Sequence, residues 1–155
     1  MARDGLTLES ELRSDCDTLW PIIEQLLVAN IDIHAMRDAT RGGLSAVLNE
    51  WAKASNVGID VEEACIPICD EVKGLCELFG FEPFDLANEG TFIMALPMDL
   101  AEGAIEVMQR YGHCEHAAII GHVTERHPGK VVLQTPWGSS RYLDLPQGEL
   151  LPRIC

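Results

Sequence analysis

Four residues in the first third of the chain combine types that suit phosphate binding. Thr40, Arg41, Gly42 and Gly43 stand in the stretch 34–44 (HAMRDATRGGL), directly before an apolar helical pattern. Glycines allow the backbone to approach an anion closely, and the first turn of a helix offers unpaired N–H groups. A threonine hydroxyl would add a hydrogen bond, and an arginine guanidinium a forked cation. The stretch therefore predicts a phosphate site, with a plain strand-to-helix turn as the alternative.

A second candidate is the carboxylate of Glu89. It stands in the stretch 84–90 (FDLANEG), just before an apolar run at 91–96 that is typical of a buried strand. A carboxylate partly shielded from water beside a core accepts a proton more readily than one in bulk solvent. Glu89 is therefore a candidate general base, although a lone glutamate in a loop is more commonly solvated or caps a helix.

The third candidate is Cys155, the last residue of the sequence. The segment 146–155 (PQGELLPRIC) contains two prolines and one glycine and follows neither a helical nor a strand period. We interpret this segment as a flexible arm, which at about 3.3 Å per residue reaches roughly 30 Å. A thiol at its tip is available for loading by another enzyme. The alternative is a cysteine without a role, placed there by chance or by the end of a segment.

The other cysteines and the histidines have simpler interpretations. No export signal is visible, so free thiols in a reducing compartment are expected. Packing is the expected explanation for five of them: Cys16, Cys65, Cys69, Cys76 and Cys114. A zinc site built from the pairs at 65–69 and 113–116 would need unusual ligand spacings, so no metal site is predicted. Surface or core positions are expected for four histidines: His34, His113, His116 and His122.

Length and charge set the class of protein. A chain of 155 residues is the size of one domain, and its 47% hydrophobic content suffices for a core. The 25 Asp and Glu residues outnumber the 11 Lys and Arg residues, giving a net charge of −14 that repels nucleic acid and anionic membranes. The longest apolar stretch, at 21–31, is interrupted by polar residues and too short to span a bilayer. We therefore expect a cytoplasmic protein.

Periodicity predicts helices interspersed with strands. Helices are expected at about 17–27, 43–55, 72–79 and 99–112, the first capped at Asp17 and Thr18, and the last by a box formed by Asp99 and Glu102. Strands are expected at 57–61, 91–96, 117–123 and 130–135, with a weaker one at 141–145. The segments 127–130 and 136–140 look like hairpin turns. This order favours an α+β layered domain with a mixed β-sheet packed by helices.

The three candidate segments together resemble the C-terminal half of the HypE family. These are hydrogenase maturation factors with carbamoyl dehydratase activity, and the segments are 36–44, 86–90 (LANEG) and the end 152–155 (PRIC). The resemblance extends from about Leu6 to Cys155. HypE belongs to the superfamily of aminoimidazole ribonucleotide synthetase and selenophosphate synthetase. The resemblance implies an α+β domain over 1–145 and a carrier arm over 146–155, with the N-terminal ATP-binding, dimer-forming domain absent from these residues.

The resemblance also implies a reaction and its partners. Cys155 would receive a carbamoyl group from the carbamoyltransferase HypF, and ATP would drive dehydration of this thiocarboxamide to a thiocyanate. The cyanide would pass to a HypC–HypD complex that assembles the iron ligands of nickel–iron hydrogenases. ATP and Mg²⁺ would be held mainly by the missing domain, through which the full-length protein forms a homodimer. The domain alone would therefore be inactive as an enzyme.

The family motifs imply roles for particular residues of this sequence. Glu89, in the Asn-Glu-Gly motif, would act as the base at the amide nitrogen. Thr40, Arg41, Gly42 and Gly43 would hold the transferred phosphate, with Asp38 beside them. Two other functions stay open: a module that docks a partner, and a domain of a synthetase that makes a small phosphorylated metabolite. Either of these would tolerate the loss of the Cys155 thiol, whereas a carrier would not.

Overall fold

The computed structural model describes residue 14 and residues 16–110 and 114–145. Four helices are found there: α1 (Trp20–Val28), α2 (Gly43–Ser55), α3 (Asp70–Phe79) and α4 (Met98–Gln109). Six strands are found in the same ranges: β1 (Ala35–Asp38), β2 (Gly58–Glu62), β3 (Phe92–Ala95), β4 (Gly121–Thr124), β5 (Val131–Gln134) and β6 (Ser140–Tyr142). Two short 3₁₀ turns, η1 (Glu63–Cys65) and η2 (Pro83–Asp85), flank α3. The arm predicted at 146–155, with Cys155, and His113 lie outside the described residues.

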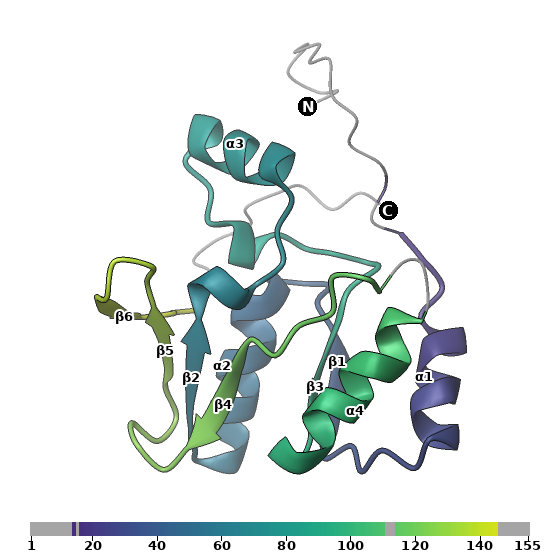
Figure 1. Ribbon diagram of the computed structural model, residues 1–155. Helices are drawn as coiled ribbons and strands as arrows, with labels where there is room; N and C mark the ends of the chain where they lie inside the picture. The colour runs from purple at the N-terminus through teal and green to yellow at the C-terminus, as the bar shows by residue number, and fades with distance from the viewer. Residues whose placement is uncertain (1–13, 15, 111–113, 146–155) are drawn as a thin grey trace.

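The strands form two separate sheets, which Figure 1 shows side by side. The larger sheet has the order β4-β2-β5-β6; β2 and β5 run parallel, and the other two pairs are antiparallel. The smaller is an antiparallel ribbon of β1 and β3, in which Asp38 pairs with Phe92. The mixed sheet and the α+β class predicted from the sequence are thus confirmed.

One predicted turn is not a hairpin. The segment 127–130 joins β4 to β5, but these strands lie on opposite sides of β2 and do not pair with each other. The turn instead wraps around the start of β2: the Gly129 N–H donates to the Val57 carbonyl (2.8 Å), and the Ile59 N–H donates to the Lys130 carbonyl (3.0 Å). The other predicted turn, at 136–140, does join the antiparallel hairpin β5–β6.

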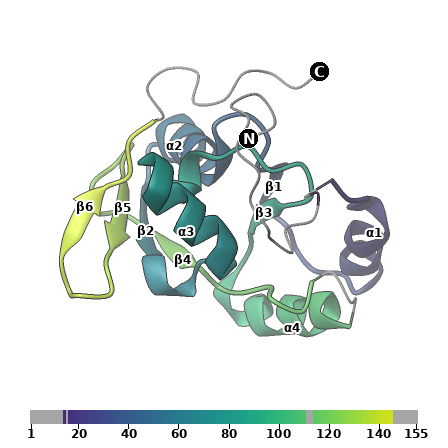
Figure 2. The same ribbon diagram turned by 90° about the horizontal axis from the view of Figure 1, so that it is seen from above.

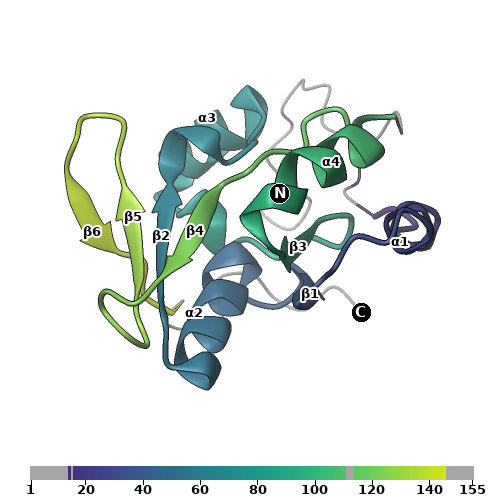
Figure 3. The ribbon, with the colours of Figure 1, turned by 60° about the horizontal axis from the view of Figure 1, so that its bottom comes forward.

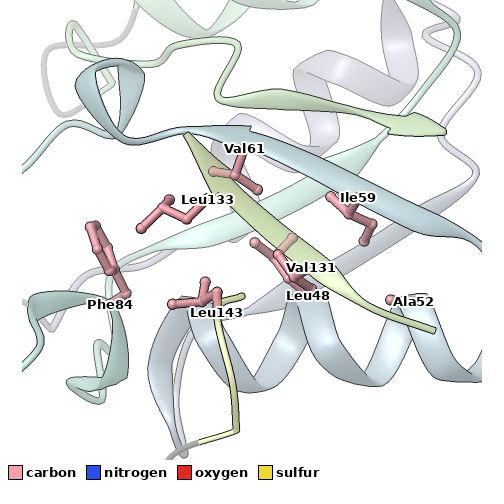
Figure 4. Packing of buried hydrophobic residues seen from close by; sticks show 8 residues of the cluster. All are labelled: Leu48, Ala52, Ile59, Val61, Phe84, Val131, Leu133 and Leu143. Atoms are coloured by element: carbon pink, nitrogen blue, oxygen red, sulfur yellow. The ribbon is translucent and has the colours of Figure 1, made fainter. Parts of the chain in front are cut away.

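The first hydrophobic core lies between α2 and the larger sheet. Its members come from α2, β2, β5, η2 and the residue after β6, and Figure 4 shows them pointing toward one another. They are Leu48, Ala52, Ile59, Val61, Phe84, Val131, Leu133 and Leu143. The apolar spacing predicted for the helix at 43–55 places Leu48 and Ala52 on this buried face. The core therefore fixes α2, and with it the glycine pair, against the sheet (Figure 3).

A second core supports the smaller sheet. Ile22 and Leu26 of α1 pack with Ala104 and Met108 of α4, and Phe92 of β3 packs against this group. Figure 2 shows α1 and α4 on the same side of the molecule, away from the β5–β6 hairpin.

No helix in the described parts of the chain is both long enough and apolar enough to cross a membrane.

Two predicted helix caps are wrong. The helix α1 has Leu19 at its N-cap position, because the Asp17 carboxylate accepts from the adjacent Thr18 N–H (2.7 Å) instead of reaching the first helical turn. The helix α4 begins at Met98 after Pro97, which places Asp99 inside the first turn, so it cannot cap the helix. A proline just before a helix fixes the backbone direction by itself. The predicted stop of α3 at Gly80 is confirmed, since Gly80 is left-handed.

Burial of the cysteines is confirmed only in part. Cys76 is buried on α3, and burial raises the pKa of its thiol, as does the charge of Glu82. Cys114 is half-buried, and burial raises its thiol pKa too. The packing explanation is wrong for Cys16, Cys65 and Cys69, which are exposed because they stand in connecting segments at helix ends and not on an apolar face. All five are free thiols.

Candidate functional site

The glycine pair forms a left-handed turn between β1 and α2. β1 ends at Asp38, and α2 begins at Gly43. Gly42 has φ of 73° and Gly43 has φ of 58°, a region that residues with a Cβ adopt only under strain. Gly42 stands at the N-cap position of α2 and has no side chain to cap the helix. The Gly43 N–H donates to the Thr40 carbonyl (3.2 Å), and no side chain caps the start of the helix.

Gly43 also lets a second segment lie directly on the start of α2. A Cβ at Gly43 would lie 2.5 Å from the Leu86 carbonyl oxygen and closer still to that of Phe84. Real Cβ atoms are not found at such distances. The residue is buried, so the segment 84–86 could not move outward without exposing the core beneath Phe84. The absence of a side chain at Gly43 is therefore what brings the two segments together.

Backbone hydrogen bonds then tie the Asn-Glu-Gly segment to the glycine turn. The Ala39 N–H donates to the Thr91 carbonyl (2.9 Å), and the Asn88 N–H donates to the Ala39 carbonyl (2.9 Å). The Asn88 side chain accepts from the Gly90 N–H (3.1 Å), which closes the turn around Glu89. Two stretches separated by about fifty residues in the sequence thus form one surface.

The side chains of the predicted site lie at the rim of this surface. The Thr40 hydroxyl donates to the Asp38 carboxylate (3.3 Å), and Asp38, Arg41 and Glu89 are exposed. The shielding from water expected for Glu89 is therefore not present: the loop holds it at the surface, where it has an interaction partner of its own. A molecule that binds at the surface can therefore contact these rim side chains.

A polar pair near the turn, the buried Ser45 and the half-buried Asp85, was not predicted. Burial raises the pKa of the Asp85 carboxyl; the Ser45 hydroxyl and Arg141 act in the opposite direction, and Glu82 raises the pKa further. Ser45 is fully buried in the first turn of α2, and its hydroxyl lies close enough to affect Asp85 without meeting the geometry of a full hydrogen bond. The Arg141 guanidinium itself pairs with Glu82 at 2.7 Å. Only the fold places these groups together, so no sequence spacing indicates them.

Asn49 connects the same helix to the end of the described chain. This side chain is buried and donates both amide hydrogens, to the Ser45 carbonyl (2.9 Å) and to the Leu143 carbonyl (2.7 Å). The Leu143 N–H in turn donates to the Val131 carbonyl (3.0 Å). Residue 143 is thus held beside α2, the helix whose first turn carries the glycine pair.

No metal cluster is found within the described ranges. No group of three or more His, Cys, Asp or Glu side chains there could hold an ion. His34, His116 and His122 lie at the surface, and each is near one carboxylate: Asp32 (3.4 Å), Glu115 (3.6 Å) and Asp60 (3.8 Å), respectively. Asp60 is buried in the middle of the sheet and also pairs with Arg126, an ion pair that sequence analysis missed. A separate open hollow lies between α1 and α4, and none of the residues that line it was predicted as a site residue.

Comparison with known proteins identifies the family. Residues 1–134 match the domain family described as AIR synthase related protein, C-terminal domain. The chain belongs to this family. The carbamoyl dehydratase HypE of Escherichia coli (strain K12) is 42% identical over 153 residues, covering 99% of this chain and 45% of that protein. HypE of Rhodobacter capsulatus is 39% identical over 154 residues, with 99% and 45% covered. The chain thus spans about half the length of the curated relatives it matches.

Solved structures show the same likeness. A crystal structure of the hydrogenase maturation protein HypE has a TM-score of 0.93 at 40% identity, covering 99% of this chain and half of that one. A HypE structure in complex with ATP has a TM-score of 0.91 at 39% identity, with 99% and 47% covered. A HypE–HypF complex has a TM-score of 0.87 at 37% identity, with 94% and 47% covered. The predicted resemblance to the C-terminal domain of HypE is confirmed.

Proposed function

We propose that this chain is the C-terminal domain of a carbamoyl dehydratase that prepares cyanide ligands for hydrogenase maturation. In this proposal residues 1–145 are the domain and residues 146–155 are the carrier arm, joined in the working enzyme to an N-terminal domain that binds ATP and forms a homodimer. The observation that carries it is the joining of the glycine turn to the Asn-Glu-Gly segment, through Asn88 and Ala39, in a chain about 40% identical to HypE.

The proposed reaction removes the oxygen of a carbamoyl group attached to the Cys155 sulfur. An amide oxygen is a poor leaving group, so it first attacks the γ-phosphorus of ATP, releasing ADP and forming a phosphate ester. The nitrogen then loses its protons, the C–O bond breaks, and phosphate leaves with the oxygen. The thiocarboxamide and ATP become a thiocyanate, ADP and phosphate, which balances as the loss of one water coupled to ATP hydrolysis.

The described residues suit the two demands of this chemistry. A phosphate group fits the first turn of α2, which has no side-chain cap and follows the left-handed Gly42 and Gly43. We propose that this turn, with Thr40 and Arg41 at its rim, holds the phosphate as it forms and leaves. Glu89, on the neighbouring loop, is proposed to accept the protons from nitrogen. The exposed Asp38 carboxylate is proposed to accept from a water of a phosphate-bound Mg²⁺, whose charge would offset that of ATP.

Cys155 is proposed to carry the group between partners. A relative has been solved as a HypE–HypF complex, and we propose that a HypF-type carbamoyltransferase loads the thiol of this chain. A HypC–HypD complex would then accept the cyanide. A free carrier thiol and a supply of ATP place these steps in the reducing cytoplasm.

The test joins this chain to the N-terminal half that its relatives carry and incubates it with the carbamoyltransferase, carbamoyl phosphate and ATP. Mass spectrometry of the C-terminal peptide should show a carbamoyl adduct on Cys155 that then loses one water. Replacement Cys155→Ala should remove both signals, and Glu89→Gln should keep the adduct and prevent the loss of water. An unmodified Cys155, with the transferase active on another acceptor, would refute the carrier role.

A further inference from the structure

The β5–β6 hairpin presents a tryptophan that the fold does not use. Trp137 stands at the tip of the turn 136–140 and is 88% exposed, the highest value among the large hydrophobic side chains of the described residues. The core beneath the hairpin is formed by Val131, Leu133 and Leu143 and does not include it. An exposed indole contributes nothing to folding and favours association, and tryptophan is strongly enriched among the residues that dominate binding at interfaces.

The turn that carries Trp137 is tightly hydrogen-bonded. The Thr135 N–H donates to the Ser139 carbonyl (2.8 Å), and the Gly138 N–H donates back to the Thr135 carbonyl (3.0 Å). The hydroxyls of Thr135 and Ser139 lie 2.7 Å apart, and the Ser140 hydroxyl donates to Gln134 (2.7 Å). The turn is therefore already ordered before a partner binds, so binding costs it little conformational entropy.

The hairpin is also the part of this acidic chain without negative charge. The stretch 126–143 contains Arg126, Lys130 and Arg141 and none of the 25 carboxylates. Arg126 and Arg141 are paired with Asp60 and Glu82 from other segments, but Lys130 lies over the ring of Tyr142, 5.6 Å from its centroid. Tyr142 is itself half-exposed. Lys130 and Tyr142 lie at the end of β5 opposite to the turn that carries Trp137, so the hairpin has an indole at its tip and a cation over an aromatic ring at its base. Such a surface fits a protein groove rimmed by carboxylates.

The same hairpin leads into the arm that ends at Cys155. β6 ends at Tyr142, and Leu143 is anchored by Asn49 and Val131 just before the arm begins. The eight residues 138–145 span at most about 26 Å, and the ten residues 146–155 at most about 33 Å. A protein seated on the hairpin is therefore within reach of the thiol.

We propose that the β5–β6 hairpin, with Trp137 as its anchor, is the docking surface for the enzyme that loads Cys155. This inference rests on the proposed function, which requires such a carbamoyl donor. The donor would hold the indole in an apolar pocket, place carboxylates near Lys130 and receive the arm in its active site.

The test measures binding and chemistry separately. Calorimetry gives the Kd of the HypF-type carbamoyltransferase for the full protein and for Trp137→Ala; we expect the Kd and the KM for loading to rise at least tenfold. Dehydration of protein that has already been loaded should be unchanged, because Trp137 is not among the residues proposed to hold the phosphate or to accept the protons. Trp20→Ala is the matched control: Trp20 is 60% exposed on α1, at the opposite edge of the molecule, and its loss should change neither value (Figure 1).

The outcomes separate the two proposals. Equal Kd values for Trp137→Ala and the unchanged protein, or equal losses for both tryptophan variants, would overturn the docking surface. A transferase that binds through Trp137 while Cys155 acquires no adduct would support the surface and refute the carrier role. Charge reversal by Lys130→Glu should also raise the Kd; an unchanged or lower Kd would refute the acidic rim proposed for the partner.

Discussion

At the scale of residues, the candidate site depends on one missing side chain more than on those present. Gly43 combines a left-handed backbone with carbonyl oxygens from 84–86 packed against its Cα. Both conditions exclude a Cβ, and both are needed for the Asn-Glu-Gly segment to reach the glycine turn. The glycine pair was predicted from the sequence as a contact for phosphate. Its role against the other segment was not predicted, because the sequence does not show which distant segment lies above it.

Replacing Gly43 by alanine should therefore damage both the fold and the site. The added methyl group must displace the carbonyls of Phe84 and Leu86 in a strained backbone, which should lower the free energy of unfolding by about 2–4 kcal/mol. Urea denaturation measures the loss. Gly103→Ala is the control: it lies inside α4 with no atom in the way and should stabilise the chain by about 0.5–1 kcal/mol. Equal effects at the two glycines would contradict this account.

The raised pKa of Asp85 predicts a particular dependence of stability on pH. Burial favours the neutral carboxyl, so the folded chain takes up this proton at a higher pH than the unfolded chain. The cost of the buried charge is fully present at neutral pH and disappears as pH falls through the raised folded-state pKa. Asp85→Asn should be more favourable to stability near pH 7 than in acid. Urea unfolding of both chains from pH 7 to 4 should show this difference shrinking; a constant or growing difference would contradict it.

At the scale of elements, the sequence patterns within single segments predicted helices and strands that are stabilised within or close to those segments. Apolar spacing located α2 and α3, and runs of β-branched residues located β2 and β5, because these patterns are set within one segment. The division into two sheets was not predicted, since it depends on pairings between strands far apart in sequence. The same holds for the position of β2 between β4 and β5, for the buried Asp60, and for the bond from Asn49 to a carbonyl 94 residues away.

Replacing Asn49 measures how much this long-range contact contributes to the free energy of unfolding. Asn49→Leu keeps a similar volume but removes both donors, leaving the buried Leu143 carbonyl without its partner, and should cost about 1–3 kcal/mol of unfolding free energy. Asn56→Gly, at the left-handed end of the same helix, should be neutral or slightly stabilising. Chemical denaturation of the two variants checks the prediction. A cost at position 56 equal to that at 49 would show that the Leu143 contact is unimportant.

At the scale of the whole molecule, the described surface supplies only part of what the proposed reaction needs. The rim residues suit phosphate and proton transfer, but the described residues contain no metal cluster. We therefore expect the chain alone to release no phosphate from ATP and form no thiocyanate, and the chain joined to an ATP-binding N-terminal half to do both. Phosphate release and the mass of the C-terminal peptide measure the two activities. Thiocyanate formed by the chain alone would show that the second half is dispensable.

The central place of β2 in its sheet has a consequence for synthesis of the chain. Both of its neighbours, β4 and β5, come from residues 121–134, so during translation the 58 residues 63–120 must be made before β2 meets its first partner strand. Such long-range pairing makes folding slow, and until then Ile59 and Val61 have no apolar cover from β5. The glycine turn, which this core holds in place, would therefore become ordered only after residues 121–134 have left the ribosome.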